Sequence, residues 1–172
     1  MTMMDYIISD YITGKAVRNV GPEAVRQDFE RFLVDEKGYD RQDIRVDEPL
    51  VVQFQGEDYP SSIDLIVCCN GKAFMAVTCV AGSIGSYERE ILAGARLVYD
   101  CQIPLAVSTD ARDAVILDTV SGKNAGNGLD AVPSKTEALE RIKTMEFIPL
   151  DENRKEREMI IYRSFNLEKI NK

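Results

Sequence analysis

The sequence predicts an α/β domain in which a helix, three antiparallel strands, a second helix and one or two further strands follow one another. Three observations support this class. The chain has 172 residues, 45% of them hydrophobic, which suits one globular domain with a sizeable core. Residues 21–39 carry apolar side chains at helical spacing. Residues 61–83 contain two apolar runs joined by Asn70-Gly71, a dipeptide typical of type I′ hairpin turns.

The first helix is expected within residues 21–39. Pro22 fits the first helical position, and Glu23 suits the positive end of the helix dipole. Gly38 is placed to end the helix. Before it, residues 1–17 form an apolar N-terminal segment that closes in a Thr-Gly-Lys turn, and we expect this segment to dock on the domain.

Three strands are expected after the first helix, at about residues 50–54, 62–68 and 73–80. A turn at residues 55–58 joins the first two, and the Asn-Gly turn joins the second to the third. The third strand is almost wholly apolar. We therefore place it in the centre of the sheet, buried on both faces.

The second helix is expected within residues 83–100, with Ser86 as its N-cap and Glu88 in its first turn. Two further strands follow within residues 103–110 and 113–118. After these strands we expect a loop rich in glycine and asparagine, SGKNAGNGLD.

The C-terminal part of the chain is predicted to be helical. Ser134 and Glu137 form a capping box that opens a helix to about Met145. A last helix begins with residues 151–158, which we interpret as a solvated face, and its apolar second half packs on the body or makes a homodimer. The sequence thus predicts a single domain at 1–172, with a core at about 21–118 and a helical extension at about 134–172.

Composition excludes several classes of function. The net charge of −8 and the pI of about 4.7 argue against unaided DNA binding, although a local basic patch stays open. The absence of histidine excludes Ser-His-Asp and Cys-His catalysis within this chain. The four cysteines form no Cys-x-x-Cys pair and are expected to be free thiols. With no signal peptide and no membrane-spanning run, we expect a cytoplasmic protein.

The element order and three stretches of sequence resemble a known group of nucleases. The stretches are GPEAVRQDFERFLVDEKGY, SSIDLIVCCNGKAFMAVTCVAG and ARLVYDCQIPLAVSTDARDAVILD. Together they resemble the PD-(D/E)xK, or restriction-endonuclease-like, superfamily. More narrowly, they are similar to the N-terminal domain of type I restriction enzyme R subunits and to small stand-alone bacterial relatives. The resemblance implies an αβββαβ core, a mixed central sheet flanked by helices, and Mg²⁺-dependent hydrolysis of phosphodiester bonds.

In these nucleases one strand carries an aspartate and the next carries Glu-x-Lys. By resemblance, Asp64 matches the aspartate, as catalytic residue and metal ligand, and Glu23 falls near an acidic residue that some members use as an extra ligand. The Glu-x-Lys positions are occupied by Thr78 and Val80. One firm carboxylate should hold Mg²⁺ only weakly. Our leading interpretation is a nuclease-like domain with a degenerate, weak or inactive metal site, acting in nucleic-acid-related binding or assembly.

A second interpretation keeps the enzyme active. Here Asp64 works with a carboxylate that has moved to the following helix, Glu88 or Glu90, and Arg89 supplies positive charge without acting as a base. The sequence therefore leaves open whether the chain is an enzyme.

A third interpretation is a protein–protein interaction module that shares only the fold. A basic rim around Asp64 would favour nucleic acid over a protein partner, and its candidate members are Lys15, Arg18, Lys72 and Arg89. Asp64 also has a structural interpretation, as an aspartate that caps a turn or pairs with a lysine.

Overall fold

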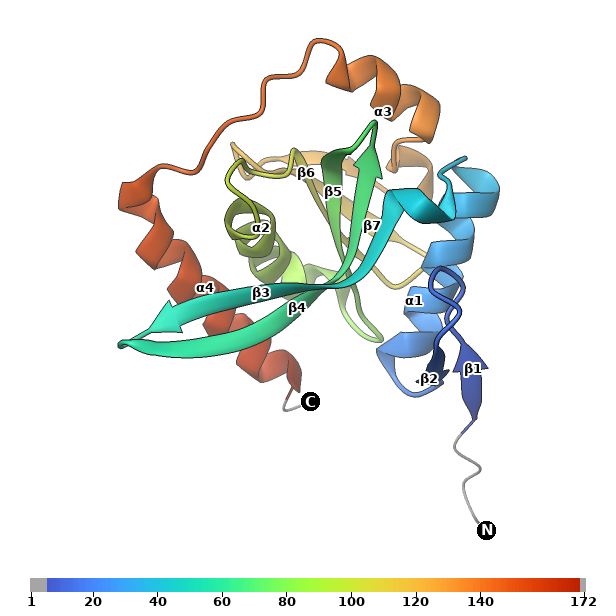
Figure 1. Ribbon diagram of the computed structural model, residues 1–172, viewed down its shortest axis with the longest axis horizontal. Coiled ribbons are helices and arrows are strands. Elements are labelled where there is room, and N and C mark those ends of the chain that lie inside the picture. Colours follow the sequence, from blue (N-terminus) through green and yellow to red (C-terminus); the bar gives the residue numbers. More distant parts are fainter. Residues whose placement is uncertain (1–5, 171–172) are drawn as a thin grey trace.

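The computed structural model describes residues 6–170, and residues 1–5 and 171–172 of the predicted 1–172 unit lie outside it (Figure 1). Its centre is a six-stranded sheet in the order β3-β4-β5-β6-β7-β8. The strands are β3 (Ile44–Phe54), β4 (Glu57–Cys69), β5 (Lys72–Cys79), β6 (Leu105–Thr109), β7 (Ala114–Asp118) and β8 (Asn124–Asn127). Strands β5 and β6 are parallel and the other neighbours antiparallel, so the predicted mixed sheet is confirmed.

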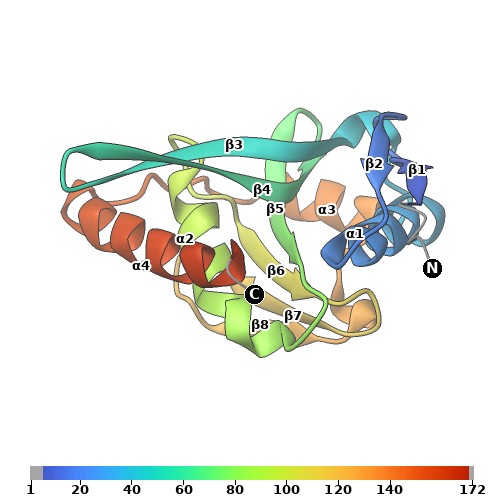
Figure 2. The ribbon, with the colours of Figure 1, turned by 90° about the horizontal axis from the view of Figure 1, so that it is seen from below.

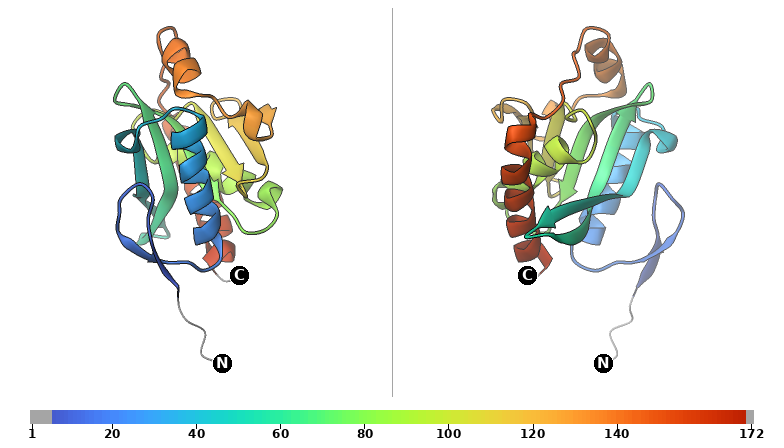
Figure 3. Two further views of the ribbon diagram at one scale, coloured as in Figure 1. Left: turned by 90° about the vertical axis from the view of Figure 1, so that its right-hand side faces the viewer. Right: turned by 60° about the vertical axis from the view of Figure 1, so that its left-hand side comes forward.

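Helices cover both faces of this sheet. Helices α1 (Pro22–Arg31) and α3 (Lys135–Ile142) pack on one face, and α2 (Glu88–Leu97) and α4 (Glu152–Ile170) lie on the other (Figures 2 and 3). Each face has its own buried cluster. Cys69 belongs to the cluster under α1 and Cys68 to the cluster under α2, as the alternation along a strand requires. Within residues 6–170, no helix is both long enough and apolar enough to cross a bilayer.

The N-terminal segment forms a hairpin beside α1, made of β1 (Ile7–Ser9) and β2 (Ala16–Arg18). Two of the hydrogen bonds that hold it there involve Gln27 of α1. The Tyr11 backbone N–H donates to Gln27 Oε1 at 2.7 Å, and Gln27 Nε2 donates to Asp10 Oδ2 at 2.8 Å. The docking predicted for this segment is therefore seen in the part of it that the structure describes.

Local sequence explains most of the element ends. Asn70 and Gly71 both have positive φ, at 53° and 75°, as a type I′ turn requires. Helix α1 begins at Pro22 and continues as a π-helical turn over Phe32–Glu36, and Gly38 follows with a φ of 80°. The capping box of Ser134 and Glu137 opens α3 as predicted. Strand β5 is buried from Phe74 onward, which agrees with its central place.

Some sequence predictions were wrong. Strand β3 begins at Ile44 and not near residue 50 as predicted. Its first half pairs with β4, although charged residues alternate there with the buried ones. Ser86 does not cap α2, since a 3₁₀ turn over Ile84–Tyr87 precedes the helix, which starts at Glu88 without a side-chain cap. The loop at 121–130 contains β8, which pairs with β7 although it lacks strand-forming residues.

Strands β3 and β4 extend beyond the rest of the sheet as a long two-stranded arm (Figure 1). Strand β5 pairs only with Leu65–Cys69 of β4, so the earlier part of β4 pairs with β3 alone. Helix α4 lies along this arm, and its Tyr162 joins the buried cluster that contains Leu50, Val52 and Ile63 of the arm (Figure 3). Asp64 stands where β4 leaves the central sheet.

A buried ion pair holds α4 on α2. Arg96 Nη1 donates to Glu158 Oε1 at 2.8 Å, and Arg96 Nε donates to the Thr119 backbone oxygen. The two side chains are only 8% and 3% exposed. Glu158 therefore departs from the solvated face predicted for residues 151–158.

We predict that Glu158→Gln lowers the free energy of unfolding by about 3 kcal/mol, because it leaves the buried Arg96 charge without its partner. Urea unfolding followed by circular dichroism measures the change. Glu156→Gln, an exposed position on the same helix, is the matched control and should have little effect. Equal stability of the two variants would contradict this account of how α4 is held.

Candidate functional site

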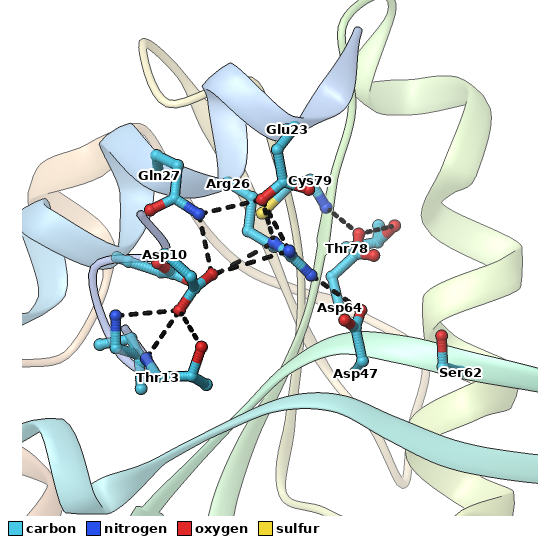
Figure 4. Close-up of polar contacts among 12 residues, drawn as sticks. Asp10, Thr13, Glu23, Arg26, Gln27, Asp47, Ser62, Asp64, Thr78 and Cys79 are labelled. Carbon is cyan, nitrogen blue, oxygen red and sulfur yellow. Dashed lines mark hydrogen bonds and ion pairs between the residues drawn. The ribbon is translucent and has the colours of Figure 1, made fainter. Parts of the chain in front are cut away.

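Asp64 accepts a hydrogen bond where the sheet divides. The Cys79 backbone N–H donates to Asp64 Oδ2 at 2.7 Å (Figure 4). Strand β4 has turned away at this point, so the carboxylate takes the place of a strand carbonyl as acceptor for β5. The β3–β4 register puts Asp47 opposite Asp64, and Asp47 has a positive φ of 53°. The β3–β4 pairing is therefore distorted next to Asp64.

The two Glu-x-Lys positions bring no charge to this point. Thr78 and Val80 are each 2% exposed. The Thr78 hydroxyl donates to Asp64 Oδ2 at 3.4 Å. Val80 continues β5 toward β6, through the hydrogen bond from its backbone N–H to the Thr109 oxygen.

A lysine from the far end of the chain supplies the charge instead. Lys169, near the end of α4, donates from Nζ to Thr78 Oγ1 at 2.7 Å and to Glu90 Oε1 at 3.2 Å. The same nitrogen lies 3.6 Å from Asp64 Oδ2. An ammonium has three N–H donors, and it meets three oxygens here. Lys169 therefore bridges β4, β5 and α2.

Glu90 is the second carboxylate of the site and is 3% exposed. Its Oε1 accepts from Lys169, and its Oε2 accepts from Asn166 Nδ2 at 3.2 Å. The Asn166 side-chain oxygen in turn accepts from Tyr59 at 2.6 Å and from Ser61 at 3.0 Å. Both oxygens of Glu90 are thus engaged by side chains of α4.

Burial and charge shift two pKa values at this site in the same direction. Burial raises the pKa of Glu90, and the nearby Lys169 charge partly opposes the shift. Burial alone would lower the pKa of Lys169, but the charges of Asp64 and Glu90 outweigh it and raise that pKa to about 12. Lys169 is therefore a fixed cation at neutral pH, and it cannot serve as a base there.

The structure brings together only some of the residues singled out in the sequence. Lys169 contacts both Glu90 and Asp64 and so links these two carboxylates. Glu88 is half-buried and Arg89 is exposed. The polar contacts found in residues 6–170 join neither Glu88 nor Arg89 to Asp64. Glu23 lines the same cleft as Asp64 but binds Arg26, through contacts of 2.6 and 3.0 Å.

Arg26 is the centre of a second polar cluster, between α1, the N-terminal hairpin and β3 (Figure 4). Its guanidinium lies 2.6 Å from Glu23, 2.7 Å from Asp47 and 3.7 Å from Asp10. Arg26 is 6% exposed. One arginine therefore serves several carboxylates at the edge of the cleft that holds Asp64.

Glu30 is the least compensated acid of this cluster. It is 0% exposed, and neither of its carboxylate oxygens has a hydrogen-bond partner. The nearest cation is Arg26, whose Nε lies 4.0 Å from Glu30 Oε1. Burial, with the Asp10 charge, raises the pKa of Glu30 to about 8. Glu30 is therefore mostly protonated in the folded protein at neutral pH.

The cleft beside Asp64 has a mixed rim. It encloses about 460 Å³, and its charged lining consists of Arg18, Glu23, Arg26, Asp47 and Asp64. Of the predicted basic rim, Arg18 lies at this cleft. Lys72 instead lies over the ring of Phe147 and lines a different groove with Tyr99. Arg89 and Lys15 are exposed but do not line the cleft.

The chain matches the type I restriction enzyme R protein N-terminus family over residues 21–133, which is more than half of its length. It belongs to that family. The narrower resemblance inferred from the three sequence stretches, to the R-subunit N-terminal domain, is thus confirmed. No curated protein and no solved structure gives a significant match.

In this R-protein N-terminal domain, the carboxylates near the Glu-x-Lys positions are engaged by protein donors. Among residues 6–170, no group of three or more Cys, Asp or Glu side chains is gathered so as to hold a metal ion. Near the Glu-x-Lys positions, Asp64 and Glu90 both contact one nitrogen, Lys169 Nζ. Both predicted metal ligands, Asp64 and Glu23, therefore have protein donors as partners.

The thiols of this R-protein N-terminal domain are free, as predicted. Cys68, Cys69 and Cys79 are buried and Cys101 is half-buried. Burial raises the pKa of the Cys79 thiol well above its usual range, and the adjacent Asp64 charge adds to the shift. Cys79 is therefore a neutral core residue, and it contributes its backbone N–H to the site.

Sequence reasoning missed Lys169 and Asn166. A signal for them exists, because Tyr162, Asn166 and Lys169 recur at spacings of four and three and so share one helix face. The apolar Ile160, Ile161 and Phe165 suggested that the other face was the buried one. In the structure, Ile160 is 43% exposed and Tyr162 and Asn166 are buried.

We predict that Glu30→Gln stabilises the protein at neutral pH. A carboxyl group with a folded pKa of about 8 and an ordinary unfolded pKa favours the folded state fully only below the unfolded value, 4.5. Between these values its contribution falls by up to about 1.4 kcal/mol per pH unit. Glu30→Gln should remove that slope, so its advantage over the wild type grows from pH 5 toward pH 8.

Urea unfolding at several pH values measures this difference. Glu36→Gln is the control, since Glu36 is exposed and follows in the same helical segment. An unchanged pH slope in Glu30→Gln would show that Glu30 is ionised in the folded protein.

Proposed function

We propose that this domain is a PD-(D/E)xK-type member of the R-protein N-terminal family that does not hydrolyse DNA and acts in nucleic-acid-related binding or assembly. One observation carries the proposal. The ammonium of Lys169 occupies the point where Asp64 and Glu90 meet. The two positions that match Glu-x-Lys are occupied by Thr78 and Val80, which are uncharged and buried.

Hydrolysis by such a site needs a cation with free coordination positions for water and phosphate. Here Glu90 has both oxygens hydrogen-bonded, and Asp64 Oδ2 already accepts from Cys79 and Thr78. An ion that bridged Asp64 and Glu90 would have to break the contacts that Lys169 and Asn166 of α4 make with these carboxylates. Mg²⁺ binding between the two carboxylates would therefore have to displace Lys169.

A second candidate is a live Mg²⁺-dependent DNA endonuclease with a rebuilt site. It is favoured by the convergence of Asp64, Glu90 and Lys169, which together restore two carboxylates and one lysine. The Asp64 and Lys169 side chains are 23% and 20% exposed, so a substrate can reach them. The two candidates differ in whether Lys169 assists a metal or stands in its place.

The choice between DNA and a protein partner rests on charge. The cleft rim carries two arginines and three carboxylates. The chain as a whole has more acidic than basic residues. Without a dominant basic surface, a protein partner within a larger assembly accounts better for this cleft than unaided DNA binding. DNA contact through a small patch around Arg18 is the alternative.

Two further expectations stay proposals. A homodimer through the C-terminal helix would use Ile160, which is 43% exposed on α4. The four free thiols support a reducing, cytoplasmic location.

We predict no DNA cleavage by the wild-type protein with Mg²⁺ or with Mn²⁺, which tolerates imperfect oxygen sites better. A plasmid-nicking assay with Asp64→Asn, Glu90→Gln and Glu88→Gln decides between the two candidates. Cutting that is lost in Asp64→Asn and Glu90→Gln but kept in Glu88→Gln would replace this proposal with the rebuilt endonuclease. Equal traces of cutting in all four proteins would identify a contaminant and leave the proposal standing.

A further inference from the structure

Lys169 is held like a bound cation. Its nitrogen contacts one hydroxyl and two carboxylates, contributed by β4, β5 and α2. Each carboxylate has a second hydrogen bond that orients it, from the Cys79 backbone N–H to Asp64 and from Asn166 to Glu90. Such oriented oxygen donors around one positive centre are the arrangement by which proteins hold small hard cations.

The charge balance of the site requires that centre. Asp64 and Glu90 both lie within 3.6 Å of the same nitrogen, and Glu90 is 3% exposed. Two carboxylates this close to each other repel, and burial strengthens the repulsion. With Lys169 present, one positive charge lies between them. Without it, the pair must bind a proton or a cation, or separate.

A metal ion cannot bridge the two carboxylates while the lysine lies between them. An ion bridging Asp64 and Glu90 would need a position about 2.1 Å from its oxygen ligands, in the space that Nζ occupies. The lysine and a metal ion that bridges these two carboxylates therefore exclude each other.

We propose that Lys169 is a built-in substitute for the divalent cation of this fold, so that Asp64 and Glu90 form a cation seat that α4 itself fills. The inference rests on the proposed function, because a non-hydrolytic domain can exchange a catalytic ion for a structural one. It assigns α4, which lies beyond the family match at residues 21–133, a role in completing the site.

The test measures Mn²⁺ binding and thermal stability, separately from cleavage. Isothermal titration calorimetry with MnCl₂ should show no binding to the wild type, whose Tm should not change with Mn²⁺. Lys169→Ala should have a lower Tm at neutral pH, bind one Mn²⁺ per chain, and regain several degrees of Tm when Mn²⁺ is added. The double variant Lys169→Ala/Glu90→Gln should lose that binding.

Lys155→Ala is the matched control, because Lys155 is exposed on the same helix. It should behave as the wild type in both measurements. If Lys169→Ala fails to fold, Lys169→Gln, which keeps most of the side chain, takes its place in the same titration.

Two results would overturn the inference. One is Mn²⁺ binding by the wild type that Asp64→Asn abolishes, which would show that the lysine yields to the metal. The other is a folded Lys169→Ala or Lys169→Gln that binds no Mn²⁺, which would show that the two carboxylates are no cation seat. Neither result involves cleavage, so the proposed function would stand or fall on its own assay.

Discussion

The ammonium of Lys169 is the contact on which the geometry of the site depends. It joins the end of α4 to β4, β5 and α2 at a point where the sheet divides. Strand β4 leaves the sheet at Asp64 to form the long arm, and helix α4 fills the space beneath that arm. The departure of β4 leaves the Cys79 backbone N–H without a strand partner, and Asp64 accepts its hydrogen bond. It also leaves room for α4, which Lys169 joins to the sheet.

Two groups of acids in this molecule are compensated to different degrees. Lys169 lies between Asp64 and Glu90, and the Cys79 backbone N–H and Asn166 also donate to these two carboxylates. Arg26 is shared among more carboxylates than it can fully serve, and Glu30 is left without a hydrogen bond. The first group therefore links α4 to the sheet, whereas Glu30 of the second adds a pH-dependent contribution to the stability.

The sequence predicted the sheet, the hairpin and the family because those features depend on local patterns. The Asn-Gly turn, the apolar β5 and the capping box of α3 each rest on a few adjacent residues. Asp64 was also predictable, since a carboxylate amid apolar strand residues is unusual. Lys169 Nζ lies 3.6 Å from Asp64 Oδ2, although no lysine was predicted from the sequence as its partner.

The partner of Asp64 could not be predicted because it comes from far along the chain. Lys169 is more than a hundred residues from Asp64, and only the placement of α4 along the arm brings them together. That placement buries the polar Tyr162 and Asn166 and exposes Ile160, against the usual order of burial. For a similar reason, Glu158 looked solvated until Arg96 was found opposite it.

A crystal structure of the wild-type protein grown in MnCl₂ tests the central claim most directly, because anomalous scattering locates Mn²⁺ without ambiguity. Our account predicts the Lys169 ammonium between Asp64 and Glu90, and no anomalous peak at that point. A manganese peak bridging the two carboxylates, with Lys169 turned away, would contradict it.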